Sequence, residues 1–144
     1  MGRTRARRRL GALDPRRIQV YEALASSDFT TPIDLEFGPG GRLWIVEDAP
    51  DIDEDIWRYD FDTGFYETLP GSYFDPAIDI EFAADGTLWI LEDAADLNED
   101  IWSFDFATEF YEALPTSDFG AALDIEFDSD GVLWILDDSI TEDV

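Results

Sequence analysis

Apolar and polar residues along this chain form short runs that recur every 45 residues. Each repeat holds four apolar or alternating runs separated by turn residues, which is the pattern of a four-stranded antiparallel meander. The period predicts an all-β chain built from near copies of one unit. It is marked by aromatic residues at three fixed phases: Tyr21, Tyr66 and Tyr111; Phe37, Phe82 and Phe127; Trp44, Trp89 and Trp134.

The second repeat shows the expected strands most clearly, over residues 78–82, 88–91, 101–106 and 110–114. Asp85-Gly86 predicts a hairpin between the first two strands, because glycine accepts a positive φ. The second strand is apolar on both faces, so both faces must be covered, as they are where the blades of a β-propeller stack. A period of about 40–50 residues with several strands favours that architecture, with one blade per repeat.

The residue sequence of the repeats also favours a β-propeller. The second repeat reads DIEFAADGTLWILED and then DIWSFDF. It resembles the blades of the NHL-repeat, virginiamycin-lyase-like and two-component-regulator propellers, and the resemblance covers nearly all of residues 18–144. It implies that DLEF, DIEF and DIEF are the innermost strands around a central channel. Such folds host many functions, and lyase chemistry is not carried over, because the chain has no histidine.

The number of blades suggests an assembly. Residues 33–69 and 78–114 each supply four strands, whereas the third unit supplies two, over 123–127 and 133–136. Residues 10–14 and 19–24 resemble the missing third and fourth strands. Because propellers typically have about four to eight blades, three blades per chain predict a six-bladed ring made by a homodimer with strand-exchanged split blades. A fibre, or a piece of a longer gene, is the alternative.

Charge divides the chain into two parts. Residues 1–17 form a basic arm of net charge +6, with seven arginines and Asp14, and are expected to contribute a strand to the last blade of a partner. Residues 18–144, which hold the three repeats, carry 34 acids against Arg42 and Arg58, a net charge of −32. Such a body repels nucleic acid and anionic membranes and attracts cations. It also suits a high-salt cytoplasm, where charge repulsion is screened.

Composition removes several classes of chemistry. The chain has no histidine and no cysteine, so zinc, copper and haem sites and histidine-based triads are not expected. The basic arm is followed by too short an apolar stretch for a signal peptide, and no run reaches the length of a membrane span. We therefore expect a soluble chain that keeps its N-terminus.

Acidic loops between the second and third strands suggest a calcium site. The D-x-[DN]-x-D spacing places alternate oxygen ligands on one side of a loop, which suits Ca²⁺. The glycine and the bidentate glutamate of an EF-hand are missing, and a solvated acidic loop is the favoured interpretation. The candidate ligands are Asp51, Asp53 and Asp55 in the first repeat, and Asp96, Asn98 and Asp100 in the second.

The innermost strands carry a second acidic set. In a ring these residues would line the channel and could bind cations, but hydrogen bonds to backbone N–H groups of the next blade are the favoured interpretation. Catalysis by acid pairs requires carboxyl groups with separated pKa values, which near-identical repeats do not favour. The channel carboxylates are Asp34 and Glu36, Asp79 and Glu81, and Asp124 and Glu126.

Aromatic residues have two interpretations, packing between blades and ligand binding. The five tryptophans, Trp44, Trp57, Trp89, Trp102 and Trp134, are expected to pack between blades. Rings in the loops from the fourth to the first strands could instead bind sugar; these are Phe29, Tyr73, Phe74 and Phe119.

The sequence thus predicts a non-enzymatic β-propeller binding or scaffold module with no catalytic residues, no cofactor other than Ca²⁺, and itself as the main partner. A calcium-dependent lactonase-like hydrolase and a calcium-dependent carbohydrate-binding propeller are the alternatives. Either alternative needs a real metal site, and the hydrolase also needs distinct residues in different blades.

Overall fold

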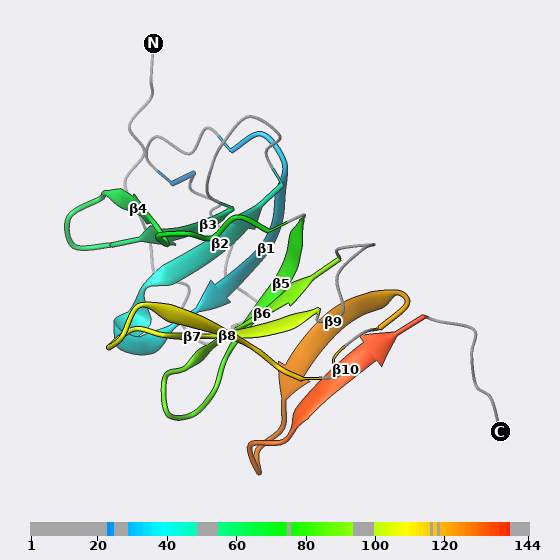
Figure 1. Cartoon of the computed structure of the whole chain (residues 1–144). Coiled ribbons are helices and arrows are strands. Elements are labelled where there is room, and N and C mark those ends of the chain that lie inside the picture. Colours follow the sequence, from blue (N-terminus) through cyan, green and yellow to red (C-terminus); the bar gives the residue numbers. More distant parts are fainter. Residues whose placement is uncertain are drawn as a thin grey trace, which may run out of the picture.

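A computed structural model describes residues 23–24, 29–48, 55–74, 76–93, 100–115, 117 and 119–138 of the chain. Within these ranges the regular structure is antiparallel strand, apart from one short 3-10 turn at Pro39–Gly41. The strands form three sheets of four, four and two strands (Figure 1). The all-β prediction is therefore confirmed. The basic arm and residues 19–22 lie outside the described residues.

Each sheet follows the chain in simple order, with every strand paired to the next. The first sheet contains β1 (Pro32–Phe37), β2 (Leu43–Glu47), β3 (Ile56–Tyr59) and β4 (Tyr66–Thr68). The second contains β5 (Ala77–Phe82), β6 (Leu88–Glu92), β7 (Ile101–Asp105) and β8 (Phe110–Ala113), and the third contains β9 (Ala122–Phe127) and β10 (Leu133–Asp137). These bounds agree with the predicted strands to within one residue at each end.

Positive-φ glycines close the hairpins between the first and second strands, as the Asp-Gly signal predicts. Gly86 and Gly131 have φ of 92° and 79°, values that other residues rarely adopt. In the β5–β6 hairpin, Asp85 also accepts a hydrogen bond from the Thr87 N–H at 2.9 Å. The aspartate before the glycine therefore ties the turn together.

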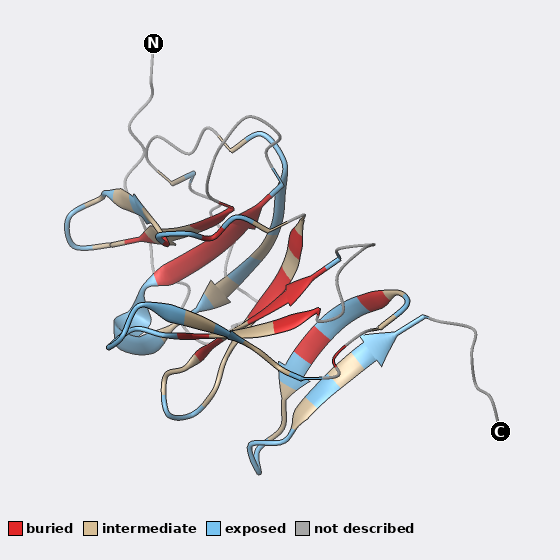
Figure 2. Cartoon of the chain, in the orientation of Figure 1, coloured by how far each residue is buried: buried red, intermediate tan, exposed pale blue. Residues whose placement is uncertain are grey.

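The sheets stack so that β5 lies between β1 and β9, each of which is the first strand of its sheet (Figure 1). Between the first two sheets, Trp44 and Val46 of β2 pack against Ile80 and Ile90. Between the second and third, Leu91 of β6 packs against Ile125. Strand β2 is buried along its whole length, whereas β10 is mostly exposed (Figure 2). Strand β6 is thus covered by a sheet on each side, whereas β2 is covered by the second sheet on one side and by a cluster that includes Leu24 and Phe29 on the other.

A buried serine joins the third and fourth strands of each complete sheet. Ser117 Oγ accepts a hydrogen bond from Ile101 N–H at 3.1 Å and donates one to the Leu114 carbonyl at 2.7 Å. Its own carbonyl accepts the Asp100 N–H at 2.8 Å. Ser72 receives the Ile56 N–H in the same way at 3.3 Å. Both hydroxyls satisfy a buried amide next to a strand start, where an unpaired N–H would be costly.

Replacing this serine should destabilise the fold. We expect Ser117→Ala to lower the free energy of unfolding by about 1–3 kcal/mol, because the buried Ile101 N–H loses its acceptor. Ser103→Ala is the matched control, since Ser103 is partly exposed on β7 and its loss should cost less than about 0.5 kcal/mol. Equal urea midpoints for the two variants would contradict this role of Ser117.

Candidate functional site

The channel carboxylates meet where the innermost strands adjoin. Asp and Glu stand two residues apart on β1, β5 and β9, so each pair lies on one face of its strand. Asp79 interacts by hydrogen bonding with Asp34 on one side and Asp124 on the other. Glu81 is hydrogen bonded to Glu126 and lies close enough to Glu36 for electrostatic repulsion. The structure therefore brings all six predicted residues into one acidic column.

The aspartates of this column bind the backbone of the next sheet. Asp34 Oδ2 accepts the Ile80 N–H at 3.3 Å, which that N–H shares with Asp79 Oδ1 at 2.9 Å, and Asp79 Oδ2 accepts the Ile125 N–H at 2.6 Å. In both contacts between sheets, the donor stands 46 residues after the acceptor. These are the backbone contacts that the favoured interpretation gives Asp34 and Asp79, and each carboxylate joins the first strand of one sheet to that of the next.

Crowding shifts the pKa values of the middle residues. Burial raises the pKa of Asp79 to about 8, and hydrogen bonds with Asp34 and Asp124 add to the rise, while the Ile125 N–H opposes it. Burial and repulsion from Glu36 and Glu126 raise the pKa of Glu81 to about 7. The pKa of Glu36 is also raised, first of all by burial. Part of the column therefore holds protons near neutral pH.

The calcium-site prediction falls mostly outside the described residues, which omit Asp51, Asp53, Asp96 and Asn98. Asp55 and Asp100, at the ends of those loops, are buried. Asp55 Oδ2 accepts the Phe74 N–H at 2.7 Å, and Asp100 Oδ2 accepts the Phe119 N–H. These carboxylates brace the turn that leads to the next sheet, and the pattern remains a prediction for the other four positions.

A second finding concerns metal binding within the described residues. Across residues 23–138, excluding the gaps in that range, no group of three or more acidic side chains is arranged to hold a metal ion.

Most of the candidate sugar-binding rings pack inward. Phe29 lies edge-on to Trp57 and Tyr66, with ring centroids 6.1 and 5.5 Å apart. Phe74 repeats this arrangement against Trp102 and Tyr111, at 6.4 and 5.7 Å. Phe119 packs into the cluster between the second and third sheets. Tyr73 differs, because it is largely exposed.

Turn aspartates form a set of structural residues, of which the sequence pattern singled out Asp85 alone. Their carboxylates accept backbone N–H groups two to four residues ahead, and this lowers their pKa values; for Asp128 the largest contribution comes from the Trp134 indole N–H. A signal was available, since aspartate is favoured where a turn begins. The residues are Asp60, Asp85, Asp105 and Asp128.

Comparison with models of known protein families gives no match, and a comparison with curated proteins gives none either. In the part of the chain that the structure describes, no helix has the length and apolar character needed to cross a membrane.

The raised pKa of Asp79 predicts how stability depends on pH. Its pKa is about 8 in the folded chain and near the ordinary value of 3.8 when unfolded. The folded state therefore binds the extra proton between these values, and stability falls as pH rises towards about 8. Asp79→Asn removes the titration and keeps an oxygen for the Ile125 N–H. We expect this variant to reduce the fall in Tm between pH 5 and pH 8 by on the order of 5 °C.

Asp85→Asn is the control for this measurement. Asp85 is exposed, and its pKa is lowered by the Thr87 N–H, so its contribution to stability is lost as pH falls rather than as it rises. An Asp79→Asn slope equal to that of the wild type between pH 5 and pH 8 would show that Asp79 is already ionised in the folded chain.

Proposed function

We propose that the chain is a non-enzymatic binding or scaffold module of the β-propeller type, which assembles with further copies of itself by strand exchange and presents an acidic face to cations. The observation that carries the proposal is the use of the innermost aspartates. Asp34 and Asp79 accept hydrogen bonds from backbone amides of the next sheet, so two aspartates of the acidic column contribute to the stacking of the sheets.

The pKa differences within the column are explained by the stacking of the sheets and do not require a hydrolase. Acid–base catalysis needs carboxyl groups in different surroundings. Here the pKa values of Asp79 and Glu81 differ from those of the equivalent residues because the middle sheet is flanked on both sides. The acids around them are the equivalent residues of the other repeats. Structural networks of this kind also perturb pKa values without catalysis.

The acidic face follows from composition. Outside the basic arm the chain carries 34 acids against two arginines, which raises the local concentration of cations without defining a site. The inward packing of Phe29 and Phe74 weighs against the carbohydrate-binding alternative.

Self-assembly predicts a mass in solution that is a multiple of the 16.3 kDa chain mass. We expect light scattering after size exclusion to give twice that mass, because two chains of three blades complete a six-bladed ring. A folded monomer over the micromolar range would contradict the proposal, and a continuous ladder of sizes would replace the ring with a fibre.

The response of the protein to Ca²⁺ distinguishes the proposed scaffold from the calcium-dependent hydrolase and lectin. We expect Ca²⁺ and Mg²⁺ at equal ionic strength to raise Tm equally, since both only screen and neutralise the acidic surface. A stoichiometric site would add a Ca²⁺-specific stabilisation that grows with the ratio of ligand to Kd. A saturable calorimetric signal for Ca²⁺ that Asp53→Asn abolishes would favour the calcium-dependent hydrolase or lectin.

A further inference from the structure

The first sheet has an apolar face that no other described sheet covers. We call it the leading face and define it as Leu35, Phe37, Leu43 and Ile45. Leu35 and Phe37 are exposed, whereas Leu43 and Ile45 are buried in a cluster that Leu24 and Phe29 pack against. The equivalents of Leu35 in the next two sheets, Ile80 and Ile125, are each 1% exposed, because the preceding sheet packs on them, whereas Leu35 is 60% exposed.

The third sheet has the complementary open surface, at the other end of the stack (Figure 2). We call it the trailing face and define it as Trp134 and Leu136 of β10. Trp134 is 63% exposed and Leu136 is 58% exposed, whereas Trp44 and Val46, the equivalent residues of β2, are 4% and 0% exposed. The difference arises because a following sheet covers β2 and none of the described sheets covers β10.

Two contacts between successive sheets repeat along the stack. The first joins an aspartate to the amide 46 residues ahead, as in Asp34 with Ile80 and Asp79 with Ile125. The second joins a tryptophan to the phenylalanine 38 residues ahead. Its ring centroids lie 5.5 Å apart for Trp44 with Phe82 and 6.2 Å apart for Trp89 with Phe127.

Three repeats of 45 residues make 135 positions. A contact that would reach a fourth repeat therefore corresponds to the residue 135 positions earlier, in the first repeat of another copy. Carried one step further, the first contact pairs Asp124 with the Leu35 N–H, and the second pairs Trp134 with Phe37. The leading and trailing faces are therefore two halves of an interface that already occurs twice within the described chain.

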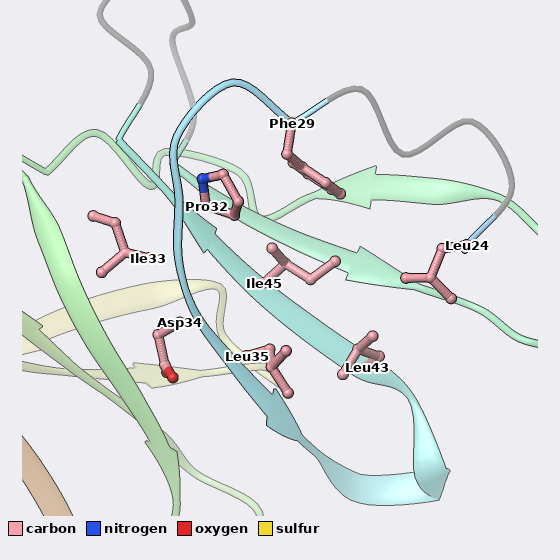
Figure 3. A pocket seen from close by; sticks show the side chains of 8 residues that line it. All are labelled: Leu24, Phe29, Pro32, Ile33, Asp34, Leu35, Leu43 and Ile45. Carbon is pink, nitrogen blue, oxygen red and sulfur yellow. The ribbon is translucent and has the colours of Figure 1, made fainter. Parts of the chain in front are cut away.

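The leading face is also hollowed. Leu35, Leu43 and Ile45 point into a cavity of about 400 Å³, while Asp34 points from β1 towards β5 (Figure 3). Leu24 and Phe29 form part of its wall. They stand 45 residues before Leu69 and Phe74, which belong to the packed interface of the first two sheets. The residues that border that interface therefore have equivalents around this cavity. By the repeat, the side chains that fill such a space are a tryptophan and a leucine from the second strand of the preceding sheet.

We propose that the leading face of one chain binds the trailing face of a second copy, with Trp134 and Leu136 in this cavity and Asp124 accepting a hydrogen bond from Leu35 N–H. This inference rests on the proposed self-assembly and names the surfaces and register that produce it. Each chain carries one face of each kind, so two copies related by a twofold axis close with two identical seams.

A mixing experiment with two blocked variants tests this interface. Leu35→Asp blocks the leading face and leaves the trailing face intact, and Trp134→Asp does the reverse. Each variant alone should dissociate at least tenfold more readily than the wild type, measured by sedimentation velocity over a concentration series. An equimolar mixture should recover a two-chain species, because one unmodified seam remains available between the two variants.

Further variants and measurements distinguish a loss of folding from a loss of assembly. Phe110→Asp replaces another exposed aromatic residue, 74% exposed on the outer strand β8, and should leave the mass unchanged. Circular dichroism checks that each variant is folded, and Leu35→Ala with Trp134→Ala gives a milder pair if a charge unfolds the chain. A wild type that is monomeric refutes the self-assembly itself. A wild type that assembles while both blocked variants assemble equally well refutes only this interface.

Discussion

The hydrogen bond that an amide of one sheet's first strand donates to a carboxylate of the preceding sheet is the interaction on which the arrangement of the sheets depends. In the described residues strand pairing stays within each sheet, so apolar packing alone would allow neighbouring sheets more than one register. Asp34 and Asp79 prevent this, because each fixes one strand to a single amide of its neighbour. A hydrogen bond has a defined direction and length, which apolar contact does not.

This solution has an electrostatic cost. Repeating the same aspartate in every sheet places like charges in a column, and the middle member is relieved by holding a proton, as the pKa of about 8 for Asp79 indicates. The column therefore combines carboxylates that accept amides with carboxyl groups that share protons. Its perturbed pKa values belong to the stacking of the repeat, which is why we assign the column a structural role.

Sequence periodicity was sufficient to predict the strands and the pairing within each sheet, because the repeat places Asp-Gly turns and doubly apolar strands at fixed intervals. It also indicated that the inner aspartates bind backbone. It did not show that Asp55 and Asp100 accept backbone amides, because an aspartate that accepts an amide and one that binds Ca²⁺ occur in the same D-x-D pattern. The roles of Ser72 and Ser117 were missed, since a serine after a strand is common in any turn and only its burial shows that it accepts an N–H.

Amide hydrogen exchange by NMR tests the stacking interaction most directly, residue by residue. The amides of Ile80 and Ile125 should exchange as slowly as the ladder amides of β2 and β6, because each donates to a carboxylate of the preceding sheet. Leu35, in the same position of the first sheet, should become equally protected only at concentrations where chains associate. Rapid exchange at Ile80 and Ile125 in the folded chain would contradict the account, because the sheets would then be held together without these bonds.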